Sequence, residues 1–400
     1  MPVSEIDLYQ TFKERAYGMR EGAMIKQCIQ CGRCAATCPF GLGMDFTPRK
    51  MVAALRAGEF GNLLEGHGVW MCTACYHCTS RCPAGIPITD VLIPALRETV
   101  LIHGRGAPVE FQNALQKVMR YGNPFGESPK KRIAWTQEAG VPVNILQKTR
   151  APVDVLLIPE CYGAYHQRGR HITIALARIL HRLGVNYGVI GPAEKCIGDA
   201  RRLAGEFGLF ELLVRHNAAQ FDKYQFKLIV TLDPHSYNAI KNAYPRFGHT
   251  YPVMHYTRFL AEHLDDLKPL LTKRLDYTVA YHDPCYLGRR NDEYEAPRAL
   301  LKAIPGVKMV ELPRNRGNSL CCGGGGGGVW LDSYIKQHVD TDRPSEKRLK
   351  EVAHHTKANM VATACPLCLT MFEDARKLLG YEDTVETADI SELIFESMED

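Results

Sequence analysis

Eight of the 15 cysteines form two runs of identical spacing near the start of the 400-residue chain. The runs are Cys28-x2-Cys31-x2-Cys34-x3-Cys38 and Cys72-x2-Cys75-x2-Cys78-x3-Cys82, and each is followed by a proline. Thiolates at this spacing bind [4Fe–4S] cubane clusters, because three cysteines of a run wrap one cluster and the fourth reaches the other cluster. The expected ligands are Cys28, Cys31, Cys34 and Cys82 for cluster 1, and Cys72, Cys75, Cys78 and Cys38 for cluster 2.

Zinc is the alternative at these cysteines, because tetrahedral sulfur sites also use C-x2-C pairs. Two complete four-cysteine runs, each ending in Cys-Pro, favour the iron–sulfur clusters. His67 and His77 are interpreted as packing or surface residues rather than ligands. Arg33 and Arg81 are interpreted as solvated, with tuning of the cluster potentials as the alternative.

Five further cysteines lie near the ends of predicted strands: Cys285, Cys321, Cys322, Cys365 and Cys368. The apolar runs 277–281, 307–312 and 360–363 precede them. Ligands of open parallel sheets bind at the carboxyl ends of the strands, so these thiols are expected to converge. Five thiolates exceed the number that a cubane takes from a protein.

The chain after residue 150 is an internal duplication of an α/β unit. Short apolar runs alternate with amphipathic stretches, which predicts strands at 153–158, 185–190 and 228–232 and helices at 172–183 and 201–214. Cys161 and Cys196 precede Cys285 and Cys321 by 124 and 125 residues, and segment 231–236 aligns with 363–368. The first repeat retains only these two cysteines; its other three positions hold Ile197, Asp233 and Ser236.

These patterns resemble the iron–sulfur proteins of the heterodisulfide reductase family. Cys-Cys-Gly at 321–323, with Cys285 upstream and Cys365-x2-Cys368 downstream, resembles the family's cysteine-rich "CCG" domain, and 28–39 and 70–83 resemble its small ferredoxin-like component. The order of the parts resembles the family's fused D-type subunits, with a degenerate first CCG repeat. The resemblance implies two cubane [4Fe–4S] clusters and one non-cubane [4Fe–4S] cluster on the five cysteines of the second repeat.

The expected fold is α+β overall, with a mostly helical bacterial-type 2[4Fe–4S] ferredoxin domain before two duplicated, Rossmann-like parallel-sheet CCG domains. Helices are predicted over 5–20, 47–57 and 88–101, with a break at 58–61. The predicted domains are 1–103 (ferredoxin-like), 104–150 (helical connector and loop), 151–270 (degenerate CCG) and 271–400 (complete CCG).

The glycine run 323–328 lacks the Gly-Lys-Ser/Thr that ends a phosphate-binding loop. It directly follows two expected ligands, which predicts close approach of the backbone of Gly323 and Gly324 to the cluster and N–H donation to its sulfurs. Cys161 and Cys196 are interpreted as ordinary buried cysteines or as residues with a redox or ligand role.

Several polar residues are candidates to line a cavity between the repeats: His235, His255, His282, Asp283, Arg289 and Arg290. Reduction of a disulfide to two thiols needs protons, so each histidine is a candidate donor, with a core or capping role as the alternative. The two arginines are candidates to contact an anionic substrate, with a solvated face as the alternative.

Charge and hydropathy exclude several classes of protein. The formal net charge is +5, divided as +6 over residues 1–150 and −1 over 151–400, which is too diffuse for a nucleic-acid surface. Residues 1–20 lack the apolar segment of a signal peptide, and no apolar run approaches the ~18 residues that span a bilayer. A cytoplasmic protein is expected, peripheral to the inner face of the membrane through a partner subunit. Residues 387–397 are predicted to pack on the protein's own core as a helix, with partner docking as the alternative.

The resemblance implies an oxidoreductase subunit in which two cubane clusters exchange single electrons with the non-cubane cluster. There a disulfide or thiol, small or carried on a protein, is reduced or oxidised. The alternative is a non-catalytic relay subunit of a flavoprotein 2-hydroxyacid (glycolate or lactate) dehydrogenase, or of another dehydrogenase, that feeds quinone. A structural zinc protein ranks last. No flavin or nicotinamide motif is visible, so the expected partners are a flavoprotein, a cytochrome b or a quinone-reactive membrane subunit, and a sulfur-carrier protein as substrate.

Overall fold

The structure is a computed structural model that describes residues 5–19, 21–103 and 106–398. The chain divides into two compact units. Unit 1 comprises Met1–Leu115, Ala200–Phe210 and Gly323–Pro344, and unit 2 comprises Gln116–Asp199, Glu211–Cys322 and Ser345–Asp400. All strands of both α/β repeats lie in unit 2, whereas Ala200–Phe210 of the first repeat, and the glycine run with the segment after it, belong to unit 1. The four-part division drawn from the sequence stays a prediction.

Unit 1 is helical in the described residues, as the sequence predicts. Pro48 opens α3 after Thr47, and Gly58 ends it with a φ of 81°, a left-handed conformation that glycine adopts without cost. The next helix begins at Phe60, so the break is shorter than predicted, and Arg20 of the first predicted helix lies outside the described residues. The helical elements are α1 (Glu5–Gly18), η1 (Gly22–Gln27), α2 (Arg33–Ala36), α3 (Pro48–Ala57), α4 (Phe60–Glu65), α5 (Gly68–Met71), α6 (His77–Ser80), η2 (Ile88–Leu92), α7 (Ile93–Ile102), η8 (Gly325–Trp330) and α20 (Asp332–His338).

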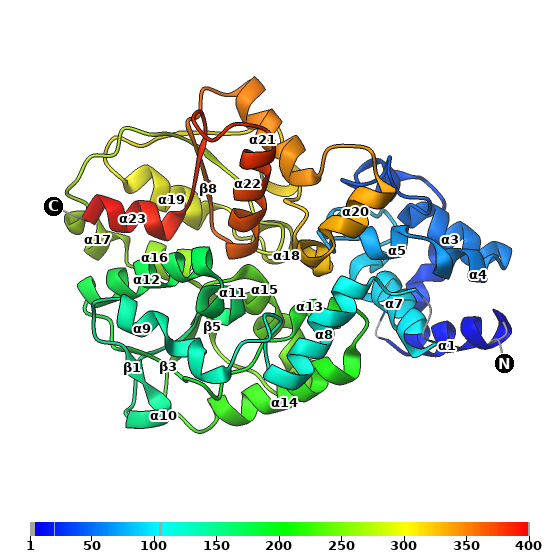
Figure 1. Ribbon diagram of the computed structural model, residues 1–400, viewed down its shortest axis with the longest axis horizontal. Helices are drawn as coiled ribbons and strands as arrows, with labels where there is room; N and C mark the ends of the chain where they lie inside the picture. The colour runs from blue at the N-terminus through cyan, green and yellow to red at the C-terminus, as the bar shows by residue number, and fades with distance from the viewer. Residues whose placement is uncertain (1–4, 20, 104–105, 399–400) are drawn as a thin grey trace. The chain divides into compact units, whose positions relative to one another are not determined.

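The core of unit 1 joins segments that are far apart in the sequence. Phe12 of α1, Phe60 of α4 and Leu96 of α7 are buried in one apolar cluster. Leu331 and Ile335, which come more than 200 residues later, belong to the same cluster. Figure 1 shows α20 in orange beside the blue and cyan helices of this unit. The segment after the Cys321-Cys322 pair is therefore a structural part of the ferredoxin-like unit.

Unit 2 contains two sheets in which every strand pair is parallel. The first sheet has the order β1-β3-β2-β4-β5 and the second has the order β7-β6-β8-β9. This confirms the predicted duplicated α/β fold. The strands are β1 (Asn144–Ile145), β2 (Val155–Ile158), β3 (Tyr187–Val189), β4 (Leu228–Thr231), β5 (Val253–His255), β6 (Thr278–Tyr281), β7 (Lys308–Val310), β8 (Met360–Thr363) and β9 (Glu386–Asp389).

Two elements differ from the sequence-based expectation. The helix predicted over 201–214 is divided into α13 (Asp199–Leu203) and α14 (Phe207–Phe221), because Gly205 has a φ of 84° between them. The helix predicted over 387–397 begins only at Ile390, since 386–389 form strand β9. That helix, α23 (Ile390–Met398), packs on the protein's own core as expected: Ile390, Leu393, Ile394 and Met398 are buried.

The two repeats share one apolar core. α12 (Gln167–Arg182) packs against α23, and α16 (Tyr256–Glu262) packs against α19 (Glu295–Ala303), so helices of one repeat lie on helices of the other (Figure 1). Tyr256 Oη donates to Asp389 at 2.6 Å across the repeats. The remaining helical elements are α8 (Val109–Tyr121), η3 (Pro129–Ile133), α9 (Trp135–Glu138), α10 (Leu146–Thr149), α11 (Glu160–Tyr165), α15 (Pro234–Asn238), η4 (Ala239–Ala243), η5 (Tyr244–Phe247), α17 (Leu264–Leu267), η6 (Lys268–Leu270), α18 (Gly288–Asn291), η7 (Arg316–Asn318), α21 (Pro344–His355) and α22 (Pro366–Leu378).

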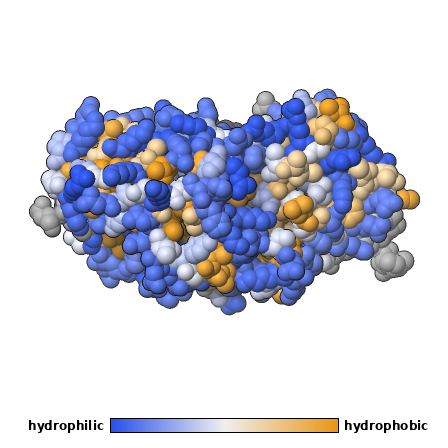
Figure 2. Space-filling model, turned by 90° about the horizontal axis from the view of Figure 1, so that it is seen from above, coloured by the Kyte–Doolittle hydropathy of each residue, from blue (hydrophilic) through white to orange (hydrophobic). Residues whose placement is uncertain are grey.

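Apolar surface is sparse on the face that Figure 2 displays, where orange residues form separate small patches among blue ones. Among the described apolar side chains, the largest exposed fractions are those of Leu42 at 95% and Ile6 at 80%. Across the described residues, no helix combines the length and apolar character that crossing a bilayer requires.

Candidate metal centres

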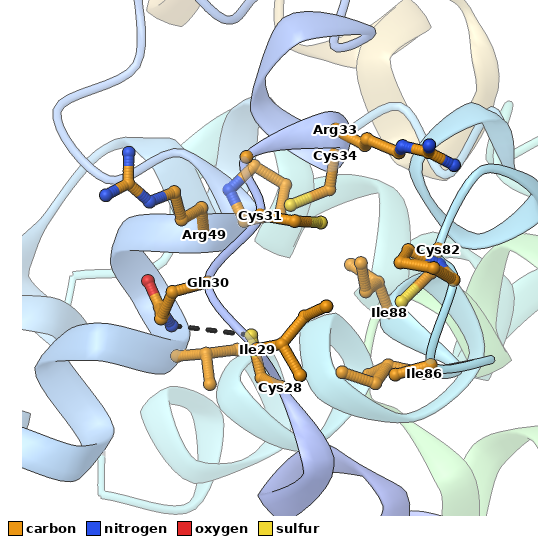
Figure 3. Close-up of a pocket in the computed structure, with 15 residues that line it drawn as sticks. Cys28, Ile29, Gln30, Cys31, Arg33, Cys34, Arg49, Cys82, Ile86 and Ile88 are labelled. Atoms are coloured by element: carbon orange, nitrogen blue, oxygen red, sulfur yellow. Dashed lines mark hydrogen bonds between the residues drawn. The ribbon is translucent and has the colours of Figure 1, made fainter.

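The first cysteine pocket gathers Cys28, Cys31 and Cys34 of the first run with Cys82 of the second run, as the spacing predicts. It has a volume of about 410 Å³, including space open to solvent. In Figure 3 the four sulfurs surround a common space that Ile86 and Ile88 also line. Gln30 Nε2 donates to Cys28 Sγ at 3.4 Å, and Cys31 is exposed.

The second pocket gathers Cys72, Cys75 and Cys78 with Cys38 of the first run, in a volume of about 370 Å³. Cys75 and Cys78 are buried. Burial raises the pKa of the Cys78 thiol well above its usual value, and the neighbouring thiolates Cys72 and Cys75 raise it further. A set of thiolates is stable in such a place only with positive charge between them, which a metal centre supplies.

Both runs fold into the same loop. Gln30 and Ala74, each directly before the second cysteine of its run, have φ values of 59° and 51°. Gly32 and Tyr76, each directly after that cysteine, have φ values of 81° and 67°. Residues with a Cβ rarely adopt this left-handed backbone conformation. Such backbone strain persists where the surrounding structure enforces it, commonly at functional sites. The repeated loop turns three sulfurs of each run toward one point, so the donor set and its geometry fit the predicted clusters.

The five cysteines of the second repeat are all buried at the carboxyl edge of their sheet. Cys285 follows β6, and Cys365 is the N-cap of α22, with Cys368 in the first turn. Cys368 Sγ and Cys322 Sγ are 3.3 Å apart, and interaction with Cys321, together with burial, raises the pKa of Cys285 well above its usual value. The predicted five-thiol set is therefore brought together, and its crowding fits a multinuclear metal centre.

Three of the predicted polar residues stabilise the loops around this site. Asp283 accepts from Arg298 at 2.6 and 3.0 Å and from the backbone N–H of Arg316 at 2.8 Å, so it fixes the loop that leads to Cys321. Arg289 donates to the Ser319 carbonyl, and Arg290 donates to Asn238 Oδ1 at 3.2 Å. These contacts stabilise the backbone that carries the cysteines.

Two of the three candidate histidines are held in the neutral form. His255 is fully buried with contacts at both ring nitrogens, to Thr257 and the Leu232 carbonyl, and burial lowers its pKa to about 3. His282 is fully buried, and neither of its ring nitrogens has a hydrogen-bond partner among the described residues. Burial lowers the pKa of His282 well below the usual value, so this ring is neutral as well.

His235 is the histidine whose surroundings favour the charged form. Its Nδ1 lies 2.9 Å from Asp199 Oδ2, and its ring stacks on Tyr286 with centroids 4.0 Å apart. Burial acts to lower the pKa of His235, but the carboxylates of Asp199 and Asp233 raise it above the usual value. The charge of Cys321 also acts on this pKa, so the imidazole lies near the five-thiol set.

In the degenerate repeat, a carboxylate stands at one of the three positions where a cysteine is missing. Asp233, the counterpart of Cys365, caps α15 through the N–H of Ser236, and its Oδ1 lies 3.9 Å from Cys365 Sγ. The ligand atoms of Glu160, Cys161 and Cys196 lie within 4.8 Å of one another, all buried. The edges of the two sheets therefore face each other within unit 2.

A buried arginine, Arg132, contacts the Glu160–Cys161–Cys196 group of the degenerate repeat. Arg132 Nη2 donates to Cys161 Sγ at 3.3 Å, and Nη1 donates to Glu194 at 2.6 Å. The sequence patterns did not identify four residues of this region: Arg132, Glu194, Glu160 and Asp199. Glu160, Glu194 and Asp199 carried a signal, since each lies within three residues of a retained cysteine, whereas Arg132 lies in the predicted connector with no motif around it.

Comparison with known proteins supports the assignment of these sites to iron–sulfur clusters. The family model "4Fe-4S dicluster domain" matches residues 24–86, and the model "Cysteine-rich domain" matches twice, at 155–241 and 279–373. The double match confirms the duplication. The fold and these matches define an iron–sulfur protein built from a dicluster domain and two cysteine-rich domains.

Three relatives place the chain within this class. It is 37% identical to the probable iron-sulfur-binding oxidoreductase FadF of Bacillus subtilis (77% of this chain, 43% of the relative) and 30% identical to the EtfAB:quinone oxidoreductase of Syntrophomonas wolfei (99% and 61%). It is 32% identical to the D-type subunit of the dihydromethanophenazine:CoB--CoM heterodisulfide reductase of Methanosarcina barkeri (76% and 72%). The chain belongs to the family of heterodisulfide reductase D-type subunits, and it spans about half the length of the first two relatives.

Proposed function

We propose that the protein is the subunit of a redox complex in which two cubane clusters exchange electrons with a non-cubane cluster that acts on a disulfide or thiol. The observation that carries this is the buried set of five cysteines in the second repeat, faced by a histidine of the first repeat whose pKa is raised. The family membership supports it, because a relative is named for a heterodisulfide reductase.

The ligand sets follow the two pockets and the five-thiol set. The first cubane takes Cys28, Cys31, Cys34 and Cys82, the second takes Cys38, Cys72, Cys75 and Cys78, and the non-cubane cluster takes Cys285, Cys321, Cys322, Cys365 and Cys368. When bound, the last cluster supplies single electrons and an iron site for sulfur. The degenerate repeat holds no cluster in this proposal, since Ile197, Asp233 and Ser236 stand in place of three of its five thiols.

His235 supplies one of the two protons that disulfide reduction needs, and the second comes from solvent. Reduction of a disulfide consumes two electrons and two protons and yields two thiols. Asp199 fixes His235 through Nδ1, which leaves Nε2 to donate toward the leaving sulfur. His255 and His282, the other candidates, are buried and neutral and cannot serve as donors at neutral pH.

A second function is favoured by one specific observation: the relative named EtfAB:quinone oxidoreductase matches 99% of this chain. In this alternative the protein is an electron relay between a flavoprotein, such as a 2-hydroxyacid dehydrogenase, and quinone. Either function requires redox partner subunits, namely a flavoprotein, a cytochrome b or a quinone-reactive membrane subunit. A quinone-linked partner would hold this protein at the inner face of a membrane.

Electron paramagnetic resonance of the oxidised holoprotein separates the two functions. Addition of a series of small thiols is expected to produce a paramagnetic signal that is lost in Cys322→Ser and retained in Cys38→Ser. A signal that persists in Cys322→Ser would reject the site. No response to any thiol, with all clusters present, would favour the relay.

A further inference from the structure

Arg97 is a fully buried arginine that donates only to backbone carbonyls. Its Nε bonds to the Val69 carbonyl at 3.0 Å, and its Nη2 bonds to the carbonyls of Trp70 at 3.1 Å and Cys72 at 2.7 Å. Its Nη1 bonds to the carbonyls of Leu203 at 3.1 Å and Gly326 at 2.8 Å. All five N–H groups of the guanidinium therefore have acceptors.

None of these acceptors carries a negative charge. Among the described residues, no carboxylate pairs with Arg97, and the groups whose charge acts on its pKa are the Cys72 thiol and the Tyr334 hydroxyl. Burial lowers the pKa of Arg97, but arginine remains charged. A fully buried cation without a counter-anion is costly, so the fold needs an anion close to Cys72.

A bound cluster would be that anion. Four thiolates around a [4Fe–4S] core carry net negative charge, and one-electron reduction adds another negative charge. A fixed cation nearby stabilises the reduced state more than the oxidised state, and the effect is strong where water is absent. Ile93, one helical turn before Arg97 on α7, lines the Cys38–Cys72–Cys75–Cys78 pocket, so this face of α7 is directed toward it.

Neither pocket has a buried cation among its described lining residues, but Arg97 lies behind the lining of the second pocket, bonded to the carbonyl of Cys72. The arginines of the first pocket, Arg33 and Arg49, are exposed at the pocket rim (Figure 3), where water screens their charge. The two runs share one loop conformation, so the environment rather than the loop distinguishes their electronic properties.

We propose that Arg97 is the fixed counter-charge of the second cubane site and raises its reduction potential. This inference rests on the proposed cluster assignment. The carbonyls of Cys72, Leu203 and Gly326 clamp the guanidinium in one position. Arg97 acts through electrostatics and position, not by touching a substrate.

Redox titration of the holoprotein, followed by the paramagnetic signals of the reduced cubanes, tests the proposal. In Arg97→Gln, the reduction potential of one of the two cubanes is expected to fall by at least 59 mV. For one electron, this shift corresponds to a tenfold change in the ratio of reduced to oxidised cluster. Arg49→Gln, the matched control at the first pocket, is expected to leave both potentials within a small fraction of that shift. Unchanged potentials in Arg97→Gln would overturn the proposal.

Two further variants cover the case in which Arg97→Gln loses iron. Arg97→Lys keeps the positive charge with fewer hydrogen bonds, so its potentials are expected to lie closer to those of the wild type than to those of Arg97→Met. Arg97→Met removes the charge and keeps an apolar stem, and it is expected to show the full fall in one potential. Equal potentials in the two variants would contradict the proposal, and a wild-type protein without two cubane signals would reject the cluster assignment itself.

Discussion

At the scale of single residues, the loops around the cysteines contain residues with a strained backbone conformation. Gln30, Ala74, Tyr76 and Glu160 all have positive φ although they carry a Cβ, and each lies beside a cysteine. The cysteine groupings were predictable because they follow the spacing of a known ligand motif, including the exchange of the fourth cysteine between the two runs. The roles of Asp199, Arg132 and Arg97 were not predictable, because their partners lie 25 to 229 residues away. Only the folded chain makes these contacts visible.

The His235–Asp199 pair leads to a residue-scale prediction. His235→Gln is expected to lower the turnover of a disulfide substrate about 10²–10⁴-fold, the usual contribution of a general acid. In the wild type, reduction should slow as the pH rises through the raised pKa of His235, because the donor must be protonated. The variant should lose this limb of the pH profile.

The control for this prediction is His181→Gln, since His181 lies exposed at the end of α12. An unchanged pH profile in His235→Gln would show that the proton comes from elsewhere. Cluster content, measured as iron per chain, is expected to be equal in all three proteins.

At the scale of elements, apolar periodicity predicted strands β2, β3, β4, β6, β7 and β8 and helices α1, α3, α7 and α12, but it identified neither α21 nor α22. β1 has two residues, too few to produce a pattern, and the division at Gly205 depends on a positive φ. The glycine run also approaches the backbone of the second cysteine run closely, which the sequence did not predict. A Cβ on Gly326 would lie 2.6 Å from the Cys72 carbonyl oxygen. The approach of Gly323 and Gly324 to a cluster stays a prediction.

The packing of this run gives an element-scale prediction. Gly327 has a φ of 92°, and a Cβ there would lie 2.2 Å from Phe111. Gly327→Ala is expected to destabilise unit 1 by about 2–4 kcal/mol, from overpacking added to left-handed strain. Gly184→Ala isolates the strain, because its φ is 67° and a Cβ there would meet none of the described atoms within 4 Å. Equal losses in chemical denaturation would contradict the packing argument.

At the scale of the whole molecule, the two repeats share one apolar core, but the carboxyl edges of their two sheets carry different side chains. The second repeat retains the thiols, and the first supplies Asp233, His235 and Asp199 toward them. In the proposed function, the second repeat would thus contribute the metal ligands and the first repeat the acid–base groups. The missing cysteines of the first repeat were visible in the sequence. The contacts of the residues in their place were not, because these contacts depend on the two sheet edges facing each other.

Iron content tests this division. Two cubanes and one non-cubane cluster amount to about 12 iron atoms per chain. Cys161→Ser should leave this number unchanged, whereas Cys322→Ser should lower it by about four. A wild-type value near 16 would mean that the degenerate repeat also binds a cluster.

A buried carboxyl makes the stability of the whole protein depend on pH. Burial raises the pKa of Asp389 to about 7, and its Oδ2 has no hydrogen-bond partner in the described part of the chain. The folded state therefore holds a proton that the unfolded state has lost, so this group destabilises the fold progressively as the pH rises from about 4 to 7, by about 4 kcal/mol in total.

Asp389→Asn should remove this dependence, since an amide keeps the oxygen that accepts from Tyr256 and Ser391. The melting temperature of the variant relative to wild type is expected to increase between pH 4 and pH 7 and to level off above. Parallel melting curves across this range would refute the assignment.

The exchange of cysteines between the two runs has a consequence for biosynthesis. The first pocket lacks one wall until Cys82 has been translated, and unit 1 receives its last segment only with Gly323–Pro344. All residues that line the two pockets lie between 28 and 93, so they have been translated long before this last segment. Iron and sulfide can therefore reach the thiols of both runs while the late segment, whose Leu331 and Ile335 complete the core of unit 1, is still being synthesised.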